Sequence, residues 1–137
     1  GEFVSVVGSN GSGKTSMLNV ICGNIDIDKG EIMIGDADIA RQKDFIRHRR
    51  IGRVYQNPSK GTCPNMTILE NLSLADNKGK AYDLAKGVNR ARIDAYKDML
   101  KPLNMGLEDR LSLKVGTLSG GQRQALALLM ATMTKKF

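Results

Sequence analysis

Residues 8–15 combine glycines with a Lys-Thr pair at a spacing that suits the phosphate groups of a nucleotide. They match the pattern G-x-x-x-x-G-K-[ST] in full, as Gly8, Ser9, Asn10, Gly11, Ser12, Gly13, Lys14 and Thr15. The glycines let successive backbone N–H groups point at phosphate oxygens. Lys14 is a flexible positive charge that can reach the β- and γ-phosphates, and the Thr15 hydroxyl can coordinate Mg²⁺. These residues, with Ser16 beside them, predict a nucleotide site.

The elements around this loop suit that chemistry. Residues 3–7 are a β-branched apolar run that predicts a strand, and residues 14–22 predict a helix that ends before Gly23. The helix would direct the positive end of its dipole at the phosphates. A strand, a glycine loop and a helix in this order make a chance match or a simple glycine-rich turn a poor explanation of the motif.

A second glycine-containing motif precedes the last predicted helix. It consists of Leu118, Ser119, Gly120, Gly121 and Gln122. Taken alone, it fits either an ordinary helix N-cap with a tight turn or an anion site, in which a serine hydroxyl, two glycine amides and a helix N-terminus face one point. Residues of this type and spacing do not decide between the two.

The rest of the chain divides by its pattern into a strand-containing part and a helical part. Short strands are expected at residues 31–35 and 51–55, and the basic stretch 40–50 fits either a helix or a loop. Thr67 and Glu70 have the spacing of a capping box at the start of a helix over residues 68–75.

An amphipathic helix is expected over residues 89–100, and Ser119 is expected to cap a long apolar helix. We therefore expect three regions: a phosphate-binding core part at 1–65, a helical part at 66–117, and the second motif with its helix at 118–137. An α/β domain needs several sheet strands. Because only one convincing core strand is present, the chain looks truncated at its C-terminus.

Composition and charge exclude several other classes of protein. The 137 residues suit one domain, and 41% hydrophobic with 26% charged residues is typical of soluble globular domains. No apolar run approaches the roughly 20 residues of a membrane-spanning helix. Cys22 and Cys63 form neither a zinc motif nor a disulfide framework. The net charge of +7 comes partly from basic runs at 41–53 and 78–92, which we interpret as solvated surface, and no nucleic-acid partner is expected.

The two motifs together resemble the ATP-binding cassette (ABC) family, whose signature reads LSGGQ and continues here with Arg123 and Gln124. Gln56, in the sequence Val-Tyr-Gln-Asn-Pro, is similar to the family's Q-loop glutamine, which contacts Mg²⁺ and the attacking water. The resemblance implies an α/β fold: a P-loop NTPase of ABC type, with a RecA-like core fragment, an antiparallel β part and an α-helical subdomain. It also implies catalytic roles for Lys14 and Gln56, and Mg²⁺ contacts for Thr15 and Gln56.

The same resemblance implies an ATP-binding subunit that hydrolyses Mg-ATP to drive transport through separate transmembrane permease subunits. A second ATP-binding subunit would pair with it head to tail, so that the signature, Leu118 to Gln122, acts on the ATP of the opposite subunit. The implied location is the cytoplasmic face of the cell membrane. Weaker similarities around residues 61–72 point to a bacterial importer.

The chain also departs from the family pattern. The Walker B Asp, the catalytic Glu, the D-loop and the switch His are expected after the signature helix and do not occur, so these residues alone are expected to be inactive in hydrolysis. His48, the single histidine, precedes Gln56 and is interpreted as a surface basic residue. Two alternatives remain open: a soluble ABC-type ATPase that acts on the ribosome or nucleic acid, and a nucleotide-binding fragment without turnover.

Overall fold

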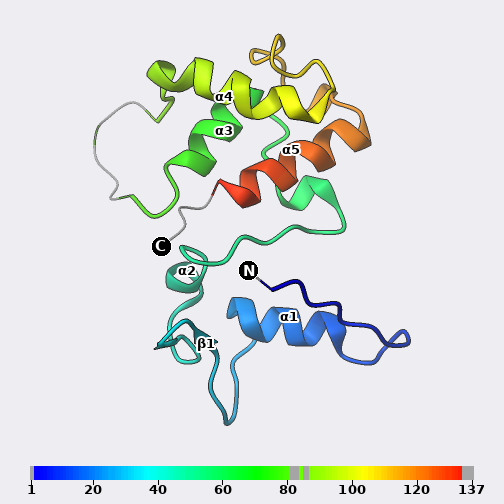
Figure 1. Ribbon diagram of the computed structural model, residues 1–137, viewed down its shortest axis with the longest axis vertical. Helices are drawn as coiled ribbons and strands as arrows, with labels where there is room; N and C mark the ends of the chain where they lie inside the picture. The colour runs from blue at the N-terminus through cyan, green and yellow to red at the C-terminus, as the bar shows by residue number, and fades with distance from the viewer. Residues whose placement is uncertain (1, 81–83, 85–86, 134–137) are drawn as a thin grey trace. The chain divides into compact units, whose positions relative to one another are not determined.

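The computed structural model describes residues 2–80, 84 and 87–133, and the chain forms two compact units, 1–51 and 52–137. The order of the elements can be followed in Figure 1. Unit 1 contains α1 (Lys14–Cys22), β1 (Met33–Ile34), β2 (Ala37–Asp38) and α2 (Asp44–Arg47). Unit 2 contains α3 (Ile68–Asp76), α4 (Ile93–Leu100) and α5 (Gly120–Thr132), with 3₁₀ turns η1 (Pro58–Lys60), η2 (Arg90–Arg92), η3 (Lys101–Leu103) and η4 (Val115–Thr117). The three functional regions expected from the sequence stay a prediction, and the packing itself divides the chain after Ile51.

The helices agree closely with the sequence-based expectations. The predicted helix 14–22 is α1, and the predicted helix 68–75 is α3 with one further residue. The expected helix over 89–100 begins with the 3₁₀ turn η2 and continues as α4. Part of the stretch left open between helix and loop is the short helix α2. A membrane span would need a longer and more apolar helix than any found in the described part of the chain.

Two of the predicted strands are wrong in this structure. Residues 3–7 have no regular secondary structure, and Phe3 and Val7 are about nine-tenths exposed, at 93% and 89%. Residues 51–55 are also irregular. A strand forms only when a neighbouring strand pairs with its backbone, and the described residues provide no such neighbour for either segment.

The predicted strand at 31–35 is reduced to a small antiparallel hairpin, β1 paired with β2. Met33 lies opposite Asp38, and Ile34 lies opposite Ala37. The Asp38 carboxylate accepts hydrogen bonds from the backbone N–H groups of Ala40, at 2.8 Å, and Ile32, at 3.1 Å. These two bonds lower the pKa of Asp38 and close the hairpin where its strands end.

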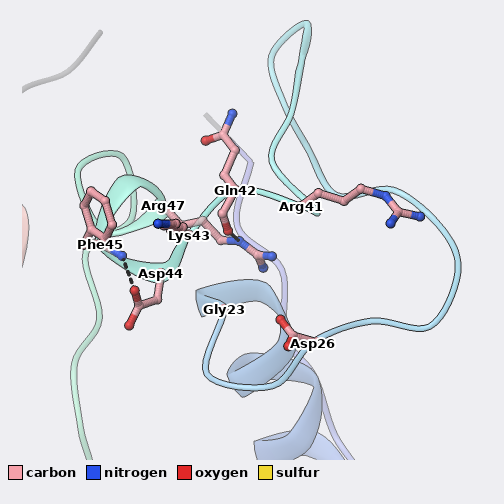
Figure 2. Close-up of a pocket in the computed structure, with 8 residues that line it drawn as sticks. All are labelled: Gly23, Asp26, Arg41, Gln42, Lys43, Asp44, Phe45 and Arg47. Carbon is pink, nitrogen blue, oxygen red and sulfur yellow. Dashed lines mark hydrogen bonds between the residues drawn. The ribbon is translucent and has the colours of Figure 1, made fainter.

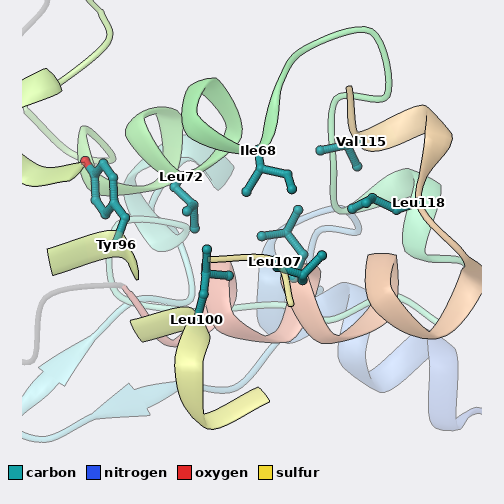
Figure 3. Close-up of a cluster of buried hydrophobic side chains, with 8 residues drawn as sticks. Ile68, Leu72, Tyr96, Leu100, Leu107, Val115 and Leu118 are labelled. Atoms are coloured by element: carbon teal, nitrogen blue, oxygen red, sulfur yellow. The ribbon is translucent and has the colours of Figure 1, made fainter. Parts of the chain in front are cut away.

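Unit 2 has a hydrophobic core built from all three of its longer helices. Helices α3, α4 and α5 each bury apolar side chains in one cluster (Figure 3). The cluster consists of Ile68, Leu72, Tyr96, Leu100, Leu107, Val115, Leu118 and Leu126. Burial of a side chain of this size contributes about 1.5–3 kcal/mol. Leu118, the first residue of the signature motif, is therefore part of the core and anchors that motif to the unit.

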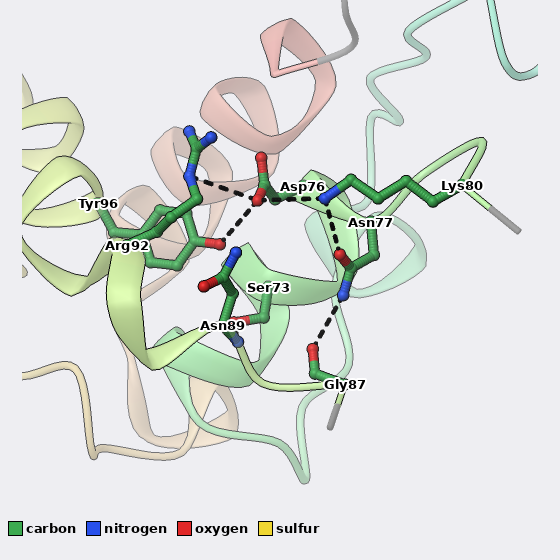
Figure 4. A network of polar contacts seen from close by, with 8 residues as sticks. All are labelled: Ser73, Asp76, Asn77, Lys80, Gly87, Asn89, Arg92 and Tyr96. Atoms are coloured by element: carbon green, nitrogen blue, oxygen red, sulfur yellow. Dashed lines mark hydrogen bonds and ion pairs between the residues drawn. The ribbon is translucent and has the colours of Figure 1, made fainter. Parts of the chain in front are cut away.

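A polar network joins α3 to α4 beside this core (Figure 4). The buried Tyr96 donates its hydroxyl to Asp76 at 3.1 Å, and Arg92 and Lys80 approach the same carboxylate oxygen at 3.4 and 3.7 Å. Burial, and then the negative charge of Asp76, raise the pKa of Tyr96. The network thus pairs the hydroxyl of the buried Tyr96 where α3 and α4 meet.

The chain that leads to the signature is held by backbone pairing with the start of α3. Ile68 N donates to Leu113 O at 3.0 Å, and Val115 N donates to Met66 O at 3.0 Å. Gly116 N donates to Pro64 O at 2.8 Å, and a Cβ at Gly116 would lie only 3.0 Å from the same oxygen. This pairing fixes the direction in which residues 113–118 approach α5.

The predicted capping box of α3 is confirmed, and it makes the stability of the protein sensitive to acid. The Glu70 carboxylate accepts from Thr67 N at 2.7 Å and from the Thr67 hydroxyl at 2.8 Å, and Thr67 in turn accepts from Glu70 N. The two bonds to the carboxylate lower its pKa below the ordinary 4.5. Its stabilising contribution is thus present above pH 4.5 and is lost as the pH falls through the lower pKa of the folded state.

We expect Glu70→Gln to remove this part of the pH dependence. Between about pH 5 and pH 3, the urea midpoint of the wild-type protein should fall by more than that of the variant. Glu31→Gln, at an exposed position outside the helices, is the matched control and should follow the wild type. Equal slopes for the wild type and Glu70→Gln would contradict the assigned role of the capping box.

Candidate functional site

The phosphate loop ends at Gly13, which is the N-cap residue of α1. Ser12 N donates to Ser9 O at 3.2 Å, which closes the turn. Gly11 and Gly13 have positive φ angles of 84° and 87°, and no atom lies within 4 Å of where a Cβ would be. No side chain caps the first turn of α1, so its leading N–H groups face outward. An anion with several oxygens is the ligand that suits such a helix start.

The Lys14 side chain folds back over the phosphate loop. Its ammonium group donates to Gly8 O at 2.8 Å, to Ser9 O at 2.7 Å and to the Ser12 hydroxyl at 3.2 Å. The loop thus concentrates one positive charge above its own backbone. Thr15 is exposed in the first turn of α1, so its hydroxyl is accessible to a metal ion that a bound phosphate also holds.

Arg47 holds the opposite, C-terminal end of α1. It was not identified as a structural residue from the sequence. It belongs to the basic run 41–53 interpreted as solvated surface, but it is only 1% exposed. Its guanidinium donates to Val20 O at 2.7 Å, to Gln42 O at 2.9 Å and also to Ala40 O. A cation at a helix C-terminus is favourable because of the helix dipole.

This contact lies beside a cavity of about 350 Å³ (Figure 2). The cavity is lined by Gly23, Asp26, Arg41, Gln42, Lys43, Asp44, Phe45 and Arg47. The guanidinium of Arg47 is already bound to carbonyls. It therefore supports α1 and, through α1, the loop that precedes this helix. No residue pattern in the sequence would have separated Arg47 from its exposed neighbours.

The signature motif turns from the core to the surface within two residues. Leu118 is buried, whereas Ser119, Gly120 and Gly121 are exposed. The predicted cap is confirmed: Ser119 Oγ accepts from Gln122 N at 3.2 Å, and the Gln122 side chain accepts from Ser119 N at 3.1 Å. The Ser119 hydroxyl can still donate its own proton. No atom lies within 4 Å of a Cβ at either glycine, so a ligand can approach the backbone closely.

Gln56 lies exposed in an irregular segment of unit 2. Just before it, the Arg53 guanidinium stacks over the Tyr55 ring at 4.7 Å from the centroid. Just after it, Asn57 caps the 3₁₀ turn η1 by accepting from Ser59 N at 3.0 Å. Gln56 and the signature thus belong to one compact unit, and the phosphate loop belongs to the other. The roles expected for these residues remain predictions.

The sequence comparisons agree with the two motifs. Residues 1–136 match the profile of the family described as ABC transporter. The chain belongs to the ABC transporter family. The fold class expected from the sequence, an α/β P-loop NTPase of ABC type, is confirmed by this match and by the solved structures that resemble the chain.

Curated relatives are similar over nearly the whole of this chain. A tyrosine transport ATP-binding protein of Clostridioides difficile strain R20291 is 44% identical over 133 residues, which are 97% of this chain and 53% of that protein. A probable branched-chain amino acid transport ATP-binding protein, LivF, of Archaeoglobus fulgidus is 34% identical over 98% of this chain and 52% of its own length. The chain therefore spans about half the length of the curated relatives it matches.

Solved structures of ABC cassettes share this architecture. A dimeric cassette in a post-hydrolysis state bound to ADP and Pi aligns with a TM-score of 0.70 at 29% identity, over 92% of this chain and 53% of that one. A nucleotide-free ATP-binding cassette from an ABC transporter aligns with a TM-score of 0.67 at 28% identity, over 92% and 51%. The assignment of the chain to the ABC family thus rests on both its sequence and its fold.

Gly13→Ala should destabilise this ABC chain, because its left-handed backbone carries a steric cost of about 1–2 kcal/mol for any residue with a Cβ. Gly120→Ala is the matched control, since Gly120 starts α5 without a positive φ angle. There alanine should stabilise the helix by up to about 1 kcal/mol. Urea unfolding of both variants measures the two free energies. Two changes of the same sign would contradict the assigned conformation of Gly13.

Proposed function

We propose that this chain is the ATP-binding part of a transport ATPase that binds Mg-ATP at residues 8–16. The observation that carries the proposal is the start of α1, where a left-handed Gly13, an uncapped first turn and the Lys14 ammonium group all face the phosphate loop. Backbone N–H groups and one mobile cation are the groups that hold a polyphosphate. A bound nucleotide would take over the hydrogen bonds that Lys14 now makes to loop carbonyls.

The remaining roles follow the same assignment. Lys14 would contact the β- and γ-phosphates, and the backbone from Gly8 to Ser16 would surround them. Thr15 would supply a hydroxyl to Mg²⁺, with Gln56 as a second contact. In the described residues there is no group of three or more His, Cys, Asp or Glu side chains that could hold a metal ion. The ion would therefore be held jointly with phosphate oxygens.

We further propose that Ser119, Gly120 and Gly121 act on the nucleotide bound to a second ATP-binding subunit. In support, all three are exposed, and the Ser119 hydroxyl keeps its proton free while it caps α5. A related cassette forms a dimer with ADP and Pi. Hydrolysis in the complete protein would open such a dimer, and binding of fresh ATP would close it.

The partners proposed for the complete protein are transmembrane permease subunits at the cytoplasmic face of the cell membrane. The relatives support a role in transport, because they include ATP-binding proteins named for tyrosine transport, diacetylchitobiose uptake and lipoprotein release. Because the cargoes differ while the ATP-binding half is shared, we assign the choice of cargo to the permease and not to these residues.

Lys14→Ala should weaken ATP binding by roughly tenfold or more, because a hydrogen bond to a charged group contributes about 1.5–3 kcal/mol. Lys29→Ala, which removes an exposed lysine from a turn of the same unit, is the matched control and should leave the affinity unchanged. Titration of a fluorescent ATP analogue measures both. If Lys14→Ala and Lys29→Ala bind equally well, the phosphate loop is not the ATP site.

Subunit mixing tests the role of the signature. In the full-length protein, Ser119→Arg should abolish ATP hydrolysis, because the bulky cation would block the approach of a γ-phosphate. Lys14→Ala should abolish it by weakening ATP binding. In a heterodimer of the two variants, both changes fall on one composite site and the other site stays intact.

We therefore expect the mixture to regain a measurable part of the wild-type rate, while either homodimer stays inactive. The matched control is a mixture of Ser119→Arg with Ser119→Arg,Lys14→Ala subunits, in which every composite site carries a change. Recovery in that control as well, or photocrosslinking of a γ-phosphate analogue to Ser119 within a monomer, would contradict action on the opposite subunit.

A further inference from the structure

The segment that carries Gln56 lies along one face of the signature helix. A Cβ at Gly52 would collide with the backbone carbonyl of Ala131, and one at Gly61 would touch the Ala127 side chain at 3.4 Å. Residues 123, 127 and 131 of α5 are spaced by four and so share one face of the helix. Residues 52–61 thus pack closely against this face at both of their ends.

Arg123 makes the polar connection at the N-terminal end of the same face. Its Nη1 donates to the Ser59 hydroxyl at 3.2 Å, three residues after Gln56. Its Nη2 donates to Gly116 O and Leu118 O, both at 3.1 Å, on the chain that enters the signature. One planar guanidinium therefore bonds to the Gln56 segment and to the signature segment at once, a geometry that no single ammonium group reproduces.

The hydroxyl of Ser59 is a specific part of this connection. Ser59 is exposed, and its backbone N–H is already bound to Asn57. Removal of the hydroxyl would therefore remove no hydrogen bond within the turn η1 and neither of the other two bonds of Arg123, so that its effect reports the loss of this one connection. The sequence showed Arg123 only as a residue that follows the signature, and gave no indication of its contact 64 positions away.

We propose that Arg123 is a positioning residue that ties the Gln56 segment to the signature, so that a displacement of either one moves the other. This inference rests on the proposed function, because it assigns Gln56 and Ser119 to one ATPase cycle. In this role Arg123 is assigned no contact with the nucleotide. It acts on turnover through the placement of Gln56, and it has no role in holding ATP at the phosphate loop.

Hydrogen exchange tests the contact independently of any activity. In the full-length protein, Ser59→Ala should speed the exchange of the amides of residues 59–61 by roughly three- to tenfold, as expected for the loss of one hydrogen bond. Ser59→Thr keeps the hydroxyl and should exchange like the wild type. Ser112→Ala, at another exposed serine of unit 2, is the control and should change nothing in this segment.

Steady-state kinetics test the role. Ser59→Ala and Arg123→Ala should each lower kcat for ATP hydrolysis by roughly three- to tenfold and leave KM for ATP within about twofold. Ser59→Thr should restore kcat. The double variant should be no slower than Arg123→Ala alone, because both changes remove the same bond.

Three results would overturn the proposal: unchanged exchange in Ser59→Ala, an effect on KM in place of kcat, or additive effects in the double variant. If Arg123→Ala fails to fold, the comparison of Ser59→Ala with Ser59→Thr tests the proposed role without it, because Ser59 is exposed. A wild-type protein that binds no ATP overturns the proposed function and this role together, and the exchange experiment then still shows whether the contact exists. The measurement of ATP binding by the wild-type protein therefore distinguishes a failure of the proposed function from a failure of the role proposed for Arg123.

Discussion

The first N–H groups of a helix have no acceptor within the helix, and the two glycine motifs of this chain depend on how that requirement is met. Helix α1 begins at a left-handed glycine with no side-chain cap, so its amides stay directed at the space above the loop. Helix α5 is capped by its own Ser119 and Gln122, which leaves two exposed glycines and one hydroxyl proton. The first arrangement leaves several N–H groups available to one ligand, and the second leaves two bare glycines that a ligand can approach from outside.

The rest of each unit keeps these helix starts in place. In unit 1, the Arg47 guanidinium holds the C-terminal end of α1 by a hydrogen bond to Val20 O. In unit 2, Leu118 is fixed in the core, and the backbone pairing of residues 64–68 with 113–116 sets the path that reaches it. The exposed part of the signature is therefore short and has a rigid base. This is the combination that a site of defined geometry requires.

The features that could be predicted from the sequence are those that depend only on residues close together in the chain. Helix α1, the capping box at Thr67 and the N-cap at Ser119 are local, and each was found at its expected place. The strands expected at 3–7 and 51–55 were wrong here, because a strand needs a partner that its own residues do not specify. Arg47 and Arg123 were missed for a related reason. Each is one arginine among several, and only its contact with a distant residue, Val20 O for Arg47 and Ser59 Oγ for Arg123, distinguishes it from a surface residue.

The anchoring of α1 by Arg47 has a consequence for the conditions under which the loop keeps its shape. The guanidinium of Arg47 is buried, and its acceptors are neutral carbonyls in part-buried positions. Changes in ionic strength screen exposed charge pairs and leave short, buried bonds of this kind almost untouched. The bonds of Arg47 behind the phosphate loop therefore depend little on salt, so purification at high salt should leave this part of the molecule intact.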